Sequence, residues 1–303
     1  MPRATVSTTN PDTIEIEFET FGSPDDPTLL LVMGFTAQLI AWDTAFCRQL
    51  AERGHHVIRY DNRDCGLSTK LDGQVVDPMA VMQAKLAGEP VPPTPYTLSD
   101  MSNDAFGLLD ALGIERAHVL GASMGGMIVQ TMAIEHPERV LSLTSVMSSP
   151  GDPRAGAPTK EALDVLLSAP PTERAAYIAN SARTAVWASK KHVDLDHLAA
   201  RAAAAYDRSF YPEGAPRQLA AIYASGDRSA ALHDVRVPTL VIHGRDDTLI
   251  QPDGGQQTAA AIPVASLLLL ANMGHDLPEP LWPTLIDAVI SHTSHAVETA
   301  RKD

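Results

Sequence analysis

Short apolar runs recur along the chain and predict its strands. The stretch from Ile14 to Phe18 alternates apolar and acidic residues, which is the period of a strand with one solvated face. We expect this strand to lie at an antiparallel edge. The later runs are almost wholly apolar, as is typical of strands buried on both faces of a parallel sheet. These runs span residues 28–34, 55–61, 117–123, 140–147, 238–244 and 265–271.

Segments with helical spacing separate these runs. Two examples are "AWDTAFCRQLAERG" and "LSDMSNDAFGLLDALG", each of which ends at a glycine, as helices often do. A regular alternation of strands and helices builds a parallel sheet with helices on both faces. The pattern therefore predicts an α/β protein with a doubly wound, mostly parallel central sheet flanked by helices.

The alternation stops in one long region. Residues 151–232 contain no convincing strand, but they include alanine-rich stretches with strong helix propensity. We therefore predict an α/β core formed by residues 1–150 and 233–303, with a helical cap insertion over residues 151–232.

A smaller excursion covers residues 77–100. Met79, Met82 and Leu86 fall there at roughly helical spacing, ahead of a proline-rich loop. The simpler interpretation is a surface helix packed on the core. The alternative is a flexible apolar wall for a substrate tail, because methionine adapts to varied shapes.

Composition narrows the class of protein. Of the 303 residues, 45% are hydrophobic, so the chain can bury a substantial core. The formal net charge is −14 and no block rich in Lys and Arg stands out, which argues against nucleic acid as a partner. The negative charge also favours a neutral or apolar substrate over an anionic one.

The cysteines and the N-terminus bear on location. Cys47 and Cys65 are too few for a disulfide framework and lack the paired spacing of a zinc site. The N-terminus has no apolar stretch suited to a signal peptide, and no run reaches the roughly 18 apolar residues of a membrane span. We expect a cytoplasmic protein with no integral membrane segment, and the sequence leaves a homodimer open.

The candidate chemistry begins at "GASMG", where a serine stands between two glycines. This G-x-S-x-G pattern lies between a predicted strand and a predicted helix, which is the place of a nucleophile on a sharp strand-to-helix turn. Small residues at 121 and 125 let neighbouring segments come close. Ser123 is the candidate nucleophile, and the alternative is a serine that only caps the following helix.

A serine nucleophile needs a base and an orienting carboxylate. His275 follows the last apolar run, and Asp246 and Asp247 follow the run before it, so all of them fall at carboxyl ends of strands, where such sheets bind ligands. The spacing from Gly244 favours Asp247, with Asp246 as a solvated turn residue or a helper. We expect the histidines within strands or the terminal helix to be structural or solvated, and His243 to be a buried core residue. This structural or solvated set contains His55, His56, His118, His292 and His295.

Two backbone N–H groups are candidates for stabilising an oxyanion. One belongs to Met124, directly after the nucleophile. The other belongs to Phe35, in the turn that Gly34 permits after the first long apolar run. The alternative for both positions is an ordinary turn between a strand and a helix.

Four segments together resemble the α/β-hydrolase family: "LLLVMGFTAQLIAWDTAFCRQLAERGHHVIRYDNRDCGLST", "HVLGASMGGM", "PTLVIHGRDD" and "MGHDLP". The first is similar to the serine esterase branch that contains aclacinomycin methylesterase. The resemblance implies the α/β-hydrolase fold, with Ser123 as nucleophile, Asp247 as acid and His275 as base. It also implies Phe35 and Met124 as the oxyanion donors.

The resemblance extends to a D-x-R-x-x-G-x-S turn, which in the family usually braces the sheet near the site. Two departures concern the pocket: Phe35 replaces a glycine of the methylesterase, and the excursion over residues 77–100 is longer. We therefore expect a substrate other than a polyketide methyl ester. The turn is formed by Asp61, Arg63, Gly66 and Ser68.

These observations predict a serine carboxylic ester hydrolase that works through an acyl-enzyme on a neutral or apolar small-molecule ester, without a metal or organic cofactor. Thioesterase, lactonase, C–C hydrolase and perhydrolase chemistry remain alternatives, because they share the triad. A different class is a non-catalytic ligand-binding receptor on the same fold. Within the cap we expect an apolar lid in which Trp187 and Phe210 bind substrate, with Tyr206 and Tyr211 beside them.

Overall fold

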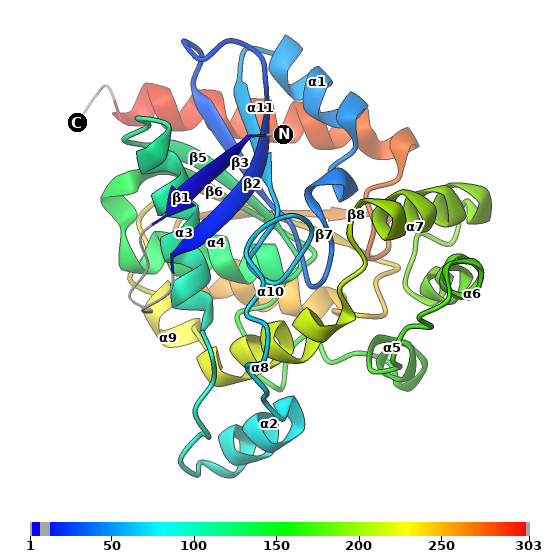
Figure 1. Cartoon of the computed structure of the whole chain (residues 1–303). Helices are drawn as coiled ribbons and strands as arrows, with labels where there is room; N and C mark the ends of the chain where they lie inside the picture. The colour runs from blue at the N-terminus through cyan, green and yellow to red at the C-terminus, as the bar shows by residue number, and fades with distance from the viewer. Residues whose placement is uncertain (1, 7–12, 301–303) are drawn as a thin grey trace.

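The computed structural model describes residues 2–6 and 13–300, with the backbone alone for residues 297–300. Within these residues, eight strands form one sheet in the order β1-β2-β4-β3-β5-β6-β7-β8 (Figure 1). Every pair from β4 to β8 is parallel, whereas β2 is antiparallel to both of its neighbours. The predicted mostly parallel sheet is confirmed. Residues 1, 7–12 and 301–303 of the predicted core lie outside the described residues.

The strands match the apolar runs closely, because each run is short and rich in branched side chains. Their bounds are β1 Arg3–Val6, β2 Ile14–Phe21, β3 Thr28–Val32 and β4 His56–Tyr60. The remaining strands are β5 Ala117–Ala122, β6 Val140–Val146, β7 Thr239–Gly244 and β8 Ala265–Leu270.

Two predictions about the sheet edges are wrong. The strand that begins at Ile14 is not at the edge, because β1 pairs with it from Arg3↔Glu17 to Val6↔Ile14. At the other end, β8 is the edge strand and is not buried on both faces, since Leu267 is 42% exposed. An apolar run does not reveal whether a second strand will pair with it.

Helices cover both faces of the sheet. The helices of the core are α1 Thr44–Glu52, α2 Pro78–Ala87, α3 Leu98–Ala111, α4 Met124–Glu135, α10 Pro252–Ala261 and α11 Trp282–Ala300. Three short 3-10 turns are η1 Leu39–Ala41, η2 Pro137–Arg139 and η5 Glu279–Leu281. As predicted, α1 and α3 end shortly before Gly54 and Gly113.

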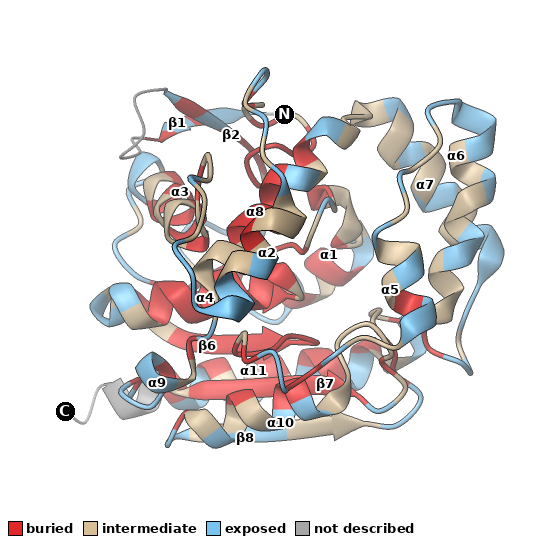
Figure 2. Cartoon of the chain, turned by 90° about the horizontal axis from the view of Figure 1, so that it is seen from below, coloured by how far each residue is buried: buried red, intermediate tan, exposed pale blue. Residues whose placement is uncertain are grey.

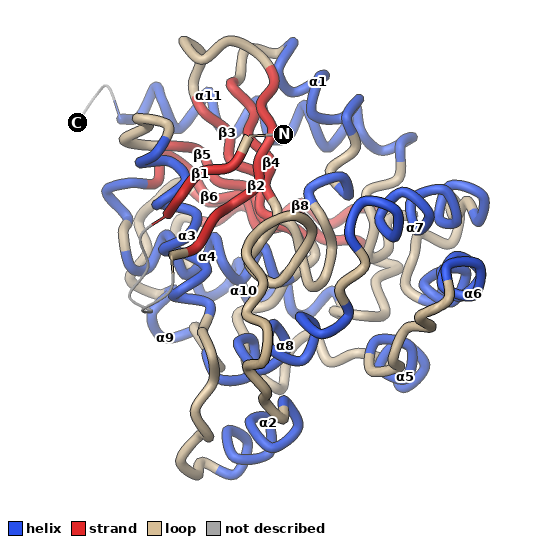
Figure 3. Tube along the Cα trace, in the orientation of Figure 1, coloured by secondary structure: helices blue, strands red, loops and turns tan. Residues whose placement is uncertain are grey.

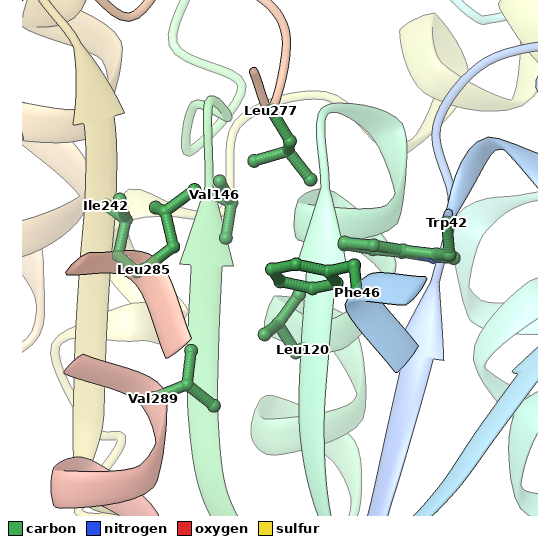
Figure 4. Close-up of a pocket in the computed structure, with 8 residues that line it drawn as sticks. All are labelled: Trp42, Phe46, Leu120, Val146, Ile242, Leu277, Leu285 and Val289. Carbon is green, nitrogen blue, oxygen red and sulfur yellow. The ribbon is translucent and has the colours of Figure 1, made fainter. Parts of the chain in front are cut away.

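Neighbouring residues of β5 show the two layers of the core. Val119 packs among side chains of α3, α4 and the end of α10, whereas Leu120 packs among side chains of α1 and α11. On the α1 and α11 side, Trp42, Phe46 and Leu285 help to line an apolar cavity of about 10 Å³ (Figure 4). A cavity of this size and lining is a packing gap that is too small for an organic ligand.

Between β6 and β7, the described chain is helix and loop only (Figure 3). We call residues 151–232 the inserted segment. Its helices are α5 Lys160–Leu166, α6 Arg174–Asn180, α7 Leu195–Ser209, α8 Ala215–Ser225 and α9 Ser229–Leu232, with the 3-10 turns η3 Ser181–Val186 and η4 Pro212–Gly214. In Figure 2, α5, α6 and α7 form one group at the side of the molecule, and α8 lies away from them toward the core.

Helix α2 packs against α8 of the inserted segment (Figure 2). Val81 is its buried residue, Met79 and Met82 are half-buried, and Leu86 is exposed. This arrangement agrees with the simpler interpretation in giving a surface helix, but the element that the helix packs against is α8 of the inserted segment.

Candidate active site

Ser123 lies on the turn between β5 and α4. Its backbone has φ 58° and ψ −122°, a combination that costs energy for any residue with a side chain. The surrounding chain holds it there, because the Ser123 N–H donates to Val146 O at 2.9 Å. The strained turn leaves the serine side chain partly exposed at the N-terminus of α4.

The two glycines that flank this serine permit close packing. A Cβ atom on Gly121 would lie 2.0 Å from the carbonyl oxygen of Gly125, and one on Gly125 would lie 2.0 Å from the carbonyl oxygen of Val32. No side chain fits at either position. The structure thus gives the physical reason for the G-x-S-x-G pattern.

His275 and Asp247 are paired. Nδ1 of His275 lies 2.7 Å from Oδ2 of Asp247. An ionised carboxylate only accepts hydrogen bonds, so Nδ1 carries the proton and Nε2 of the neutral ring is the free base. The other oxygen of Asp247, Oδ1, accepts the N–H groups of Leu249 and Ile250, both at 2.9 Å.

The environment of Asp247 keeps it ionised. Burial by itself would raise the pKa of this carboxyl group, but His275 and His243 beside it outweigh burial, and the pKa lies below its usual value. Asp246 is placed differently: its side chain is half-exposed and its N–H donates to Met273 O at 2.9 Å. The structure therefore places Asp247, and not Asp246, against His275.

His243 is a buried core residue, as predicted, but its contact with Asp247 was not foreseen. Its Nε2 lies 2.8 Å from Ile250 O and 3.4 Å from Oδ2 of Asp247. A carbonyl oxygen only accepts, so Nε2 carries a proton and faces the carboxylate. His243 lies in β7 and Asp247 in the turn after it, so no helical spacing marks this contact in the sequence.

Both reacting atoms are unpaired in the part of the chain that the structure describes. Neither the Ser123 hydroxyl nor Nε2 of His275 makes a hydrogen bond there, and none joins the two residues. Bonds between a nucleophile and its base are often loose before substrate binds. Ser123 follows β5 and His275 follows β8, so both stand at carboxyl ends of parallel strands.

The turn after β3 lies against the candidate nucleophile. A Cβ atom on Gly34 would lie 3.0 Å from the Cβ atom of Ser123. The next residue, Phe35, is half-buried, and Met124 is buried. Within the described residues, neither the Phe35 N–H nor the Met124 N–H donates a hydrogen bond, so each remains a free donor.

The inserted segment reaches the base through its main chain. The His275 N–H donates to Trp187 O at 2.6 Å, and the Ser189 N–H donates to Oδ1 of Asp276 at 3.0 Å. Gly274 packs directly on this stretch, since a Cβ atom there would lie 2.4 Å from Trp187 O. Trp187 therefore lies beside His275, with its side chain half-buried.

Phe210 belongs to an aromatic cluster within the inserted segment. Its ring stacks on Tyr206 with centroids 4.6 Å apart, and it meets Tyr177 edge-on at 5.4 Å. Tyr177 was missed by the sequence analysis, because nothing in its spacing marks it. Tyr211 is turned away from this cluster: its hydroxyl donates to Oδ1 of Asp72 at 2.6 Å and accepts from Arg217 at 2.7 Å.

The D-x-R-x-x-G-x-S turn braces the chain beside the site. Asp61 accepts the N–H groups of Leu39 at 2.6 Å and Leu67 at 2.8 Å. Arg63 and Asp104 form a fully buried, two-pronged ion pair with distances of 2.6 and 2.7 Å. These contacts are structural, in line with what the family resemblance implies.

Other histidines also have structural partners. His55 lies 3.0 Å from the Thr293 hydroxyl, and His118 lies 2.8 Å from the Ser142 hydroxyl. His292 lies 3.2 Å from Leu143 O. In the described part of the chain, no group of three His, Cys, Asp or Glu side chains is arranged to hold a metal ion.

A serine on a strained strand-to-helix turn, with a carboxylate-held histidine after a later strand, defines a hydrolase-type site on an α/β fold. The sequence profile described as "alpha/beta hydrolase fold" matches residues 27–279, and the chain belongs to this family. The predicted family and fold class are thereby confirmed.

Relatives and solved structures agree with this assignment. The chain is 27% identical to rhodomycin D methylesterase DauP of Streptomyces sp. (strain C5), over 94% of this chain and 97% of that protein. It is 29% identical to the putative carbamate hydrolase RutD of Pseudomonas syringae pv. syringae, over 88% and 93% of the two chains. The enol-lactonase of Burkholderia xenovorans LB400 superposes with a TM-score of 0.73 at 22% identity, over 97% of this chain and 100% of that one, and so shares the fold.

Proposed function

We propose that this protein is a serine hydrolase of carboxylic esters that works through an acyl-enzyme. The observation that carries the proposal is the Asp247-held His275, whose free Nε2 stands at the same edge of the sheet as Ser123 on its strained turn. Ser123, His275 and Asp247 are then nucleophile, base and orienting acid. The Phe35 and Met124 N–H groups are the proposed oxyanion donors.

The reaction follows from these roles. The Ser123 oxygen attacks the ester carbonyl carbon while Nε2 of His275 takes the hydroxyl proton, and the carbonyl oxygen becomes the oxyanion. The C–O bond to the alcohol breaks, and His275 gives the proton to the leaving alcohol. A water molecule then attacks the acyl-enzyme and loses its proton to His275. Breakdown of this second intermediate releases the acid and returns the proton to Ser123.

A neutral or apolar small-molecule ester is the proposed substrate. The formal charge of −14 disfavours anionic substrates over long range. The aromatic cluster around Phe210 and the half-buried Trp187 beside His275 are the proposed apolar contacts, with Trp187 the better placed of the two. The names of DauP and RutD support ester or related acyl chemistry, each name being a statement about that relative.

A cytoplasmic location is also a proposal. Its support is that Cys47 and Cys65 are both free, buried thiols, as suits a reducing compartment. No helix in the described residues has the length and apolarity needed to cross a bilayer.

The test is hydrolysis of p-nitrophenyl esters of graded acyl length, and of methyl esters, by the wild type and by Ser123→Ala. We expect activity in the wild type and a loss of at least about 10³-fold in kcat in the variant. Ser99→Ala is the matched control, because Ser99 lies on α3 and bonds Glu135 on the surface. It should retain wild-type rates.

Other outcomes redirect the assignment. Equal rates in the wild type and Ser123→Ala would overturn the serine mechanism. If esters are inert but turnover of a thioester, a lactone or a C–C substrate, or formation of a peroxyacid from hydrogen peroxide, depends on Ser123, the triad holds and the bond type changes. Labelling of Ser123 by a fluorophosphonate without turnover of any substrate would point to a ligand-binding receptor.

A further inference from the structure

The loop that carries one proposed oxyanion donor is held by the inserted segment. The Thr36 N–H donates to Oε1 of Gln218 at 2.8 Å. Nε2 of Gln218, in turn, donates to Arg63 O at 2.9 Å. Gln218 lies on α8 and is completely buried. Its side chain therefore joins three parts of the chain: the loop after β3, the D-x-R-x-x-G-x-S turn after β4 and the inserted segment.

The backbone at Thr36 needs such support. Its φ is 56°, in the left-handed region that β-branched residues avoid. Strained conformations of this kind persist only where their surroundings hold them. Thr36 is exposed, so its own side chain is not packed into the core. Two hydrogen bonds hold its backbone: the N–H donates to Gln218, and the carbonyl oxygen accepts from Sγ of Cys65 at 3.3 Å. The bond to Gln218 is the one that acts on the Phe35–Thr36 peptide group.

A second contact holds the far end of the same loop. Nε2 of Gln38 donates to Ala205 O at 2.7 Å and to Ser209 O at 2.8 Å, both on α7. Oε1 of Gln38 accepts from Arg208 at 2.8 Å. The loop over residues 34–39 is therefore held between Ser123 on one side and the two helices α7 and α8 on the other.

We propose that Gln218 is a positioning residue for the oxyanion hole. It holds the Phe35–Thr36 peptide group so that the neighbouring Phe35 N–H stays aimed at the carbonyl oxygen of a substrate on Ser123. The inserted segment then helps to build the catalytic site instead of only covering it. This inference rests on the proposed ester hydrolysis, because it assigns Gln218 to a step of that reaction.

The expected signature is a kinetic one. Oxyanion donors act in the transition state, and loss of one typically costs about 10²- to 10³-fold in kcat. Misaiming a donor costs less than deleting it, so we expect kcat to fall about 10- to 100-fold in Gln218→Met. KM should change by less than about three-fold, since a group that acts only in the transition state does not affect ground-state binding.

Gln130 provides a matched control. It is also completely buried, with Nε2 donating to the Ser145 hydroxyl at 3.1 Å and Oε1 accepting from Arg228 at 3.2 Å. Gln130→Met thus removes one donated and one accepted hydrogen bond, as Gln218→Met does, away from the oxyanion loop. Rates for all variants are normalised to the folded fraction. Gln218→Asn and Gln130→Asn form a second pair, in which a shorter amide cannot reach the same partner.

Amide hydrogen exchange gives a readout that does not need activity. In the Gln218 variants we expect faster exchange in the peptide covering residues 34–39, and no change there in the Gln130 variants. Unchanged loop exchange would overturn the proposal, whether or not the wild type hydrolyses esters. If the Gln218 variants exchange faster in this loop but have the same kcat as the Gln130 variants, Gln218 only tethers the loop. This result would also overturn the proposal.

The two proposals can fail separately. Absence of Ser123-dependent hydrolysis defeats the proposed function, whereas the exchange experiment still decides whether Gln218 holds the loop. Ser123-dependent hydrolysis with an unaltered kcat in both Gln218 variants defeats only the role of Gln218.

Discussion

Nε2 of His243 lies 3.4 Å from Oδ2 of Asp247, the oxygen that also accepts the Nδ1–H of His275 at 2.7 Å. Oδ1 of the same carboxylate accepts two backbone N–H groups. Both oxygens are therefore held by donors from fixed groups, and the carboxylate plane cannot turn without breaking several contacts. A base oriented by such a carboxylate is itself fixed in tautomer and direction.

Asp247→Asn should lower kcat by about 10³- to 10⁴-fold with little change in fold. The amide can present its NH₂ group to His275, which favours the tautomer with the proton on Nε2 and removes the free base. Steady-state kinetics and a circular dichroism spectrum are the measurements. Asp246→Asn is the control, because Asp246 is half-exposed and its N–H bonds Met273 O; it should stay within about two-fold of wild type. The reverse ranking of the two variants would reassign the acid.

His243→Leu should lower kcat by a smaller factor, about three- to ten-fold, and destabilise the fold by about 1–3 kcal/mol. The change removes a buried donor that faces Asp247 and Ile250 O, and leaves that carbonyl unsatisfied. A double-mutant cycle checks the route of the effect. If His243 acts through Asp247, His243→Leu has no further effect on kcat in the Asp247→Asn background. Additive losses of kcat would show that it acts elsewhere.

Arg63→Leu should be strongly destabilising, by about 3–5 kcal/mol, because it leaves the Asp104 carboxylate buried without its partner. Burial already raises the pKa of Asp104, so an uncompensated charge there is unfavourable. Urea unfolding measures the loss, and Arg63→Leu/Asp104→Leu should recover part of it. Arg174→Leu breaks an exposed pair with Asp207 and should shift the midpoint little. Equal shifts for Arg63→Leu and Arg174→Leu would contradict a bracing role for the buried pair.

The strands could be predicted because short apolar runs mark buried strands. The pairing of Asp247 with His275 could be predicted because both residues follow parallel strands, and residues in that position meet at one edge of the sheet. The four-residue strand β1 was missed because so short a stretch carries little pattern. The exposure of Leu267 was missed because an edge is a property of the whole sheet.

The roles of Gln218 and Tyr177 could not be predicted for a different reason. Both lie in the inserted segment, where tertiary contacts decide how the helices are placed over the core. Gln218 bonds Thr36, 182 positions away in sequence. Only the folded chain shows such a contact, whereas the strand-to-helix turn around Ser123 is built within five consecutive residues, 121–125.

The buried His118 should make this protein less stable in acid. Burial, together with the nearby His55 and His292, lowers the pKa of His118 to about 3. In the unfolded chain this pKa is about 6.5, so between these values the unfolded state binds a proton that the native state does not. The contribution of His118 to the free energy of unfolding therefore falls as the pH drops from about 6.5 toward 3, by up to ~1.4 kcal/mol per pH unit. His118→Asn keeps a polar group near Ser142 but cannot titrate, so its unfolding free energy should depend less steeply on pH.

His233→Asn, on a side chain that is 74% exposed, is the control and should keep the wild-type slope. The measurement is urea unfolding of the three proteins between about pH 4 and 7. If the unfolding free energies of wild type and His118→Asn depend on pH in the same way, His118 does not cause the loss of stability in acid.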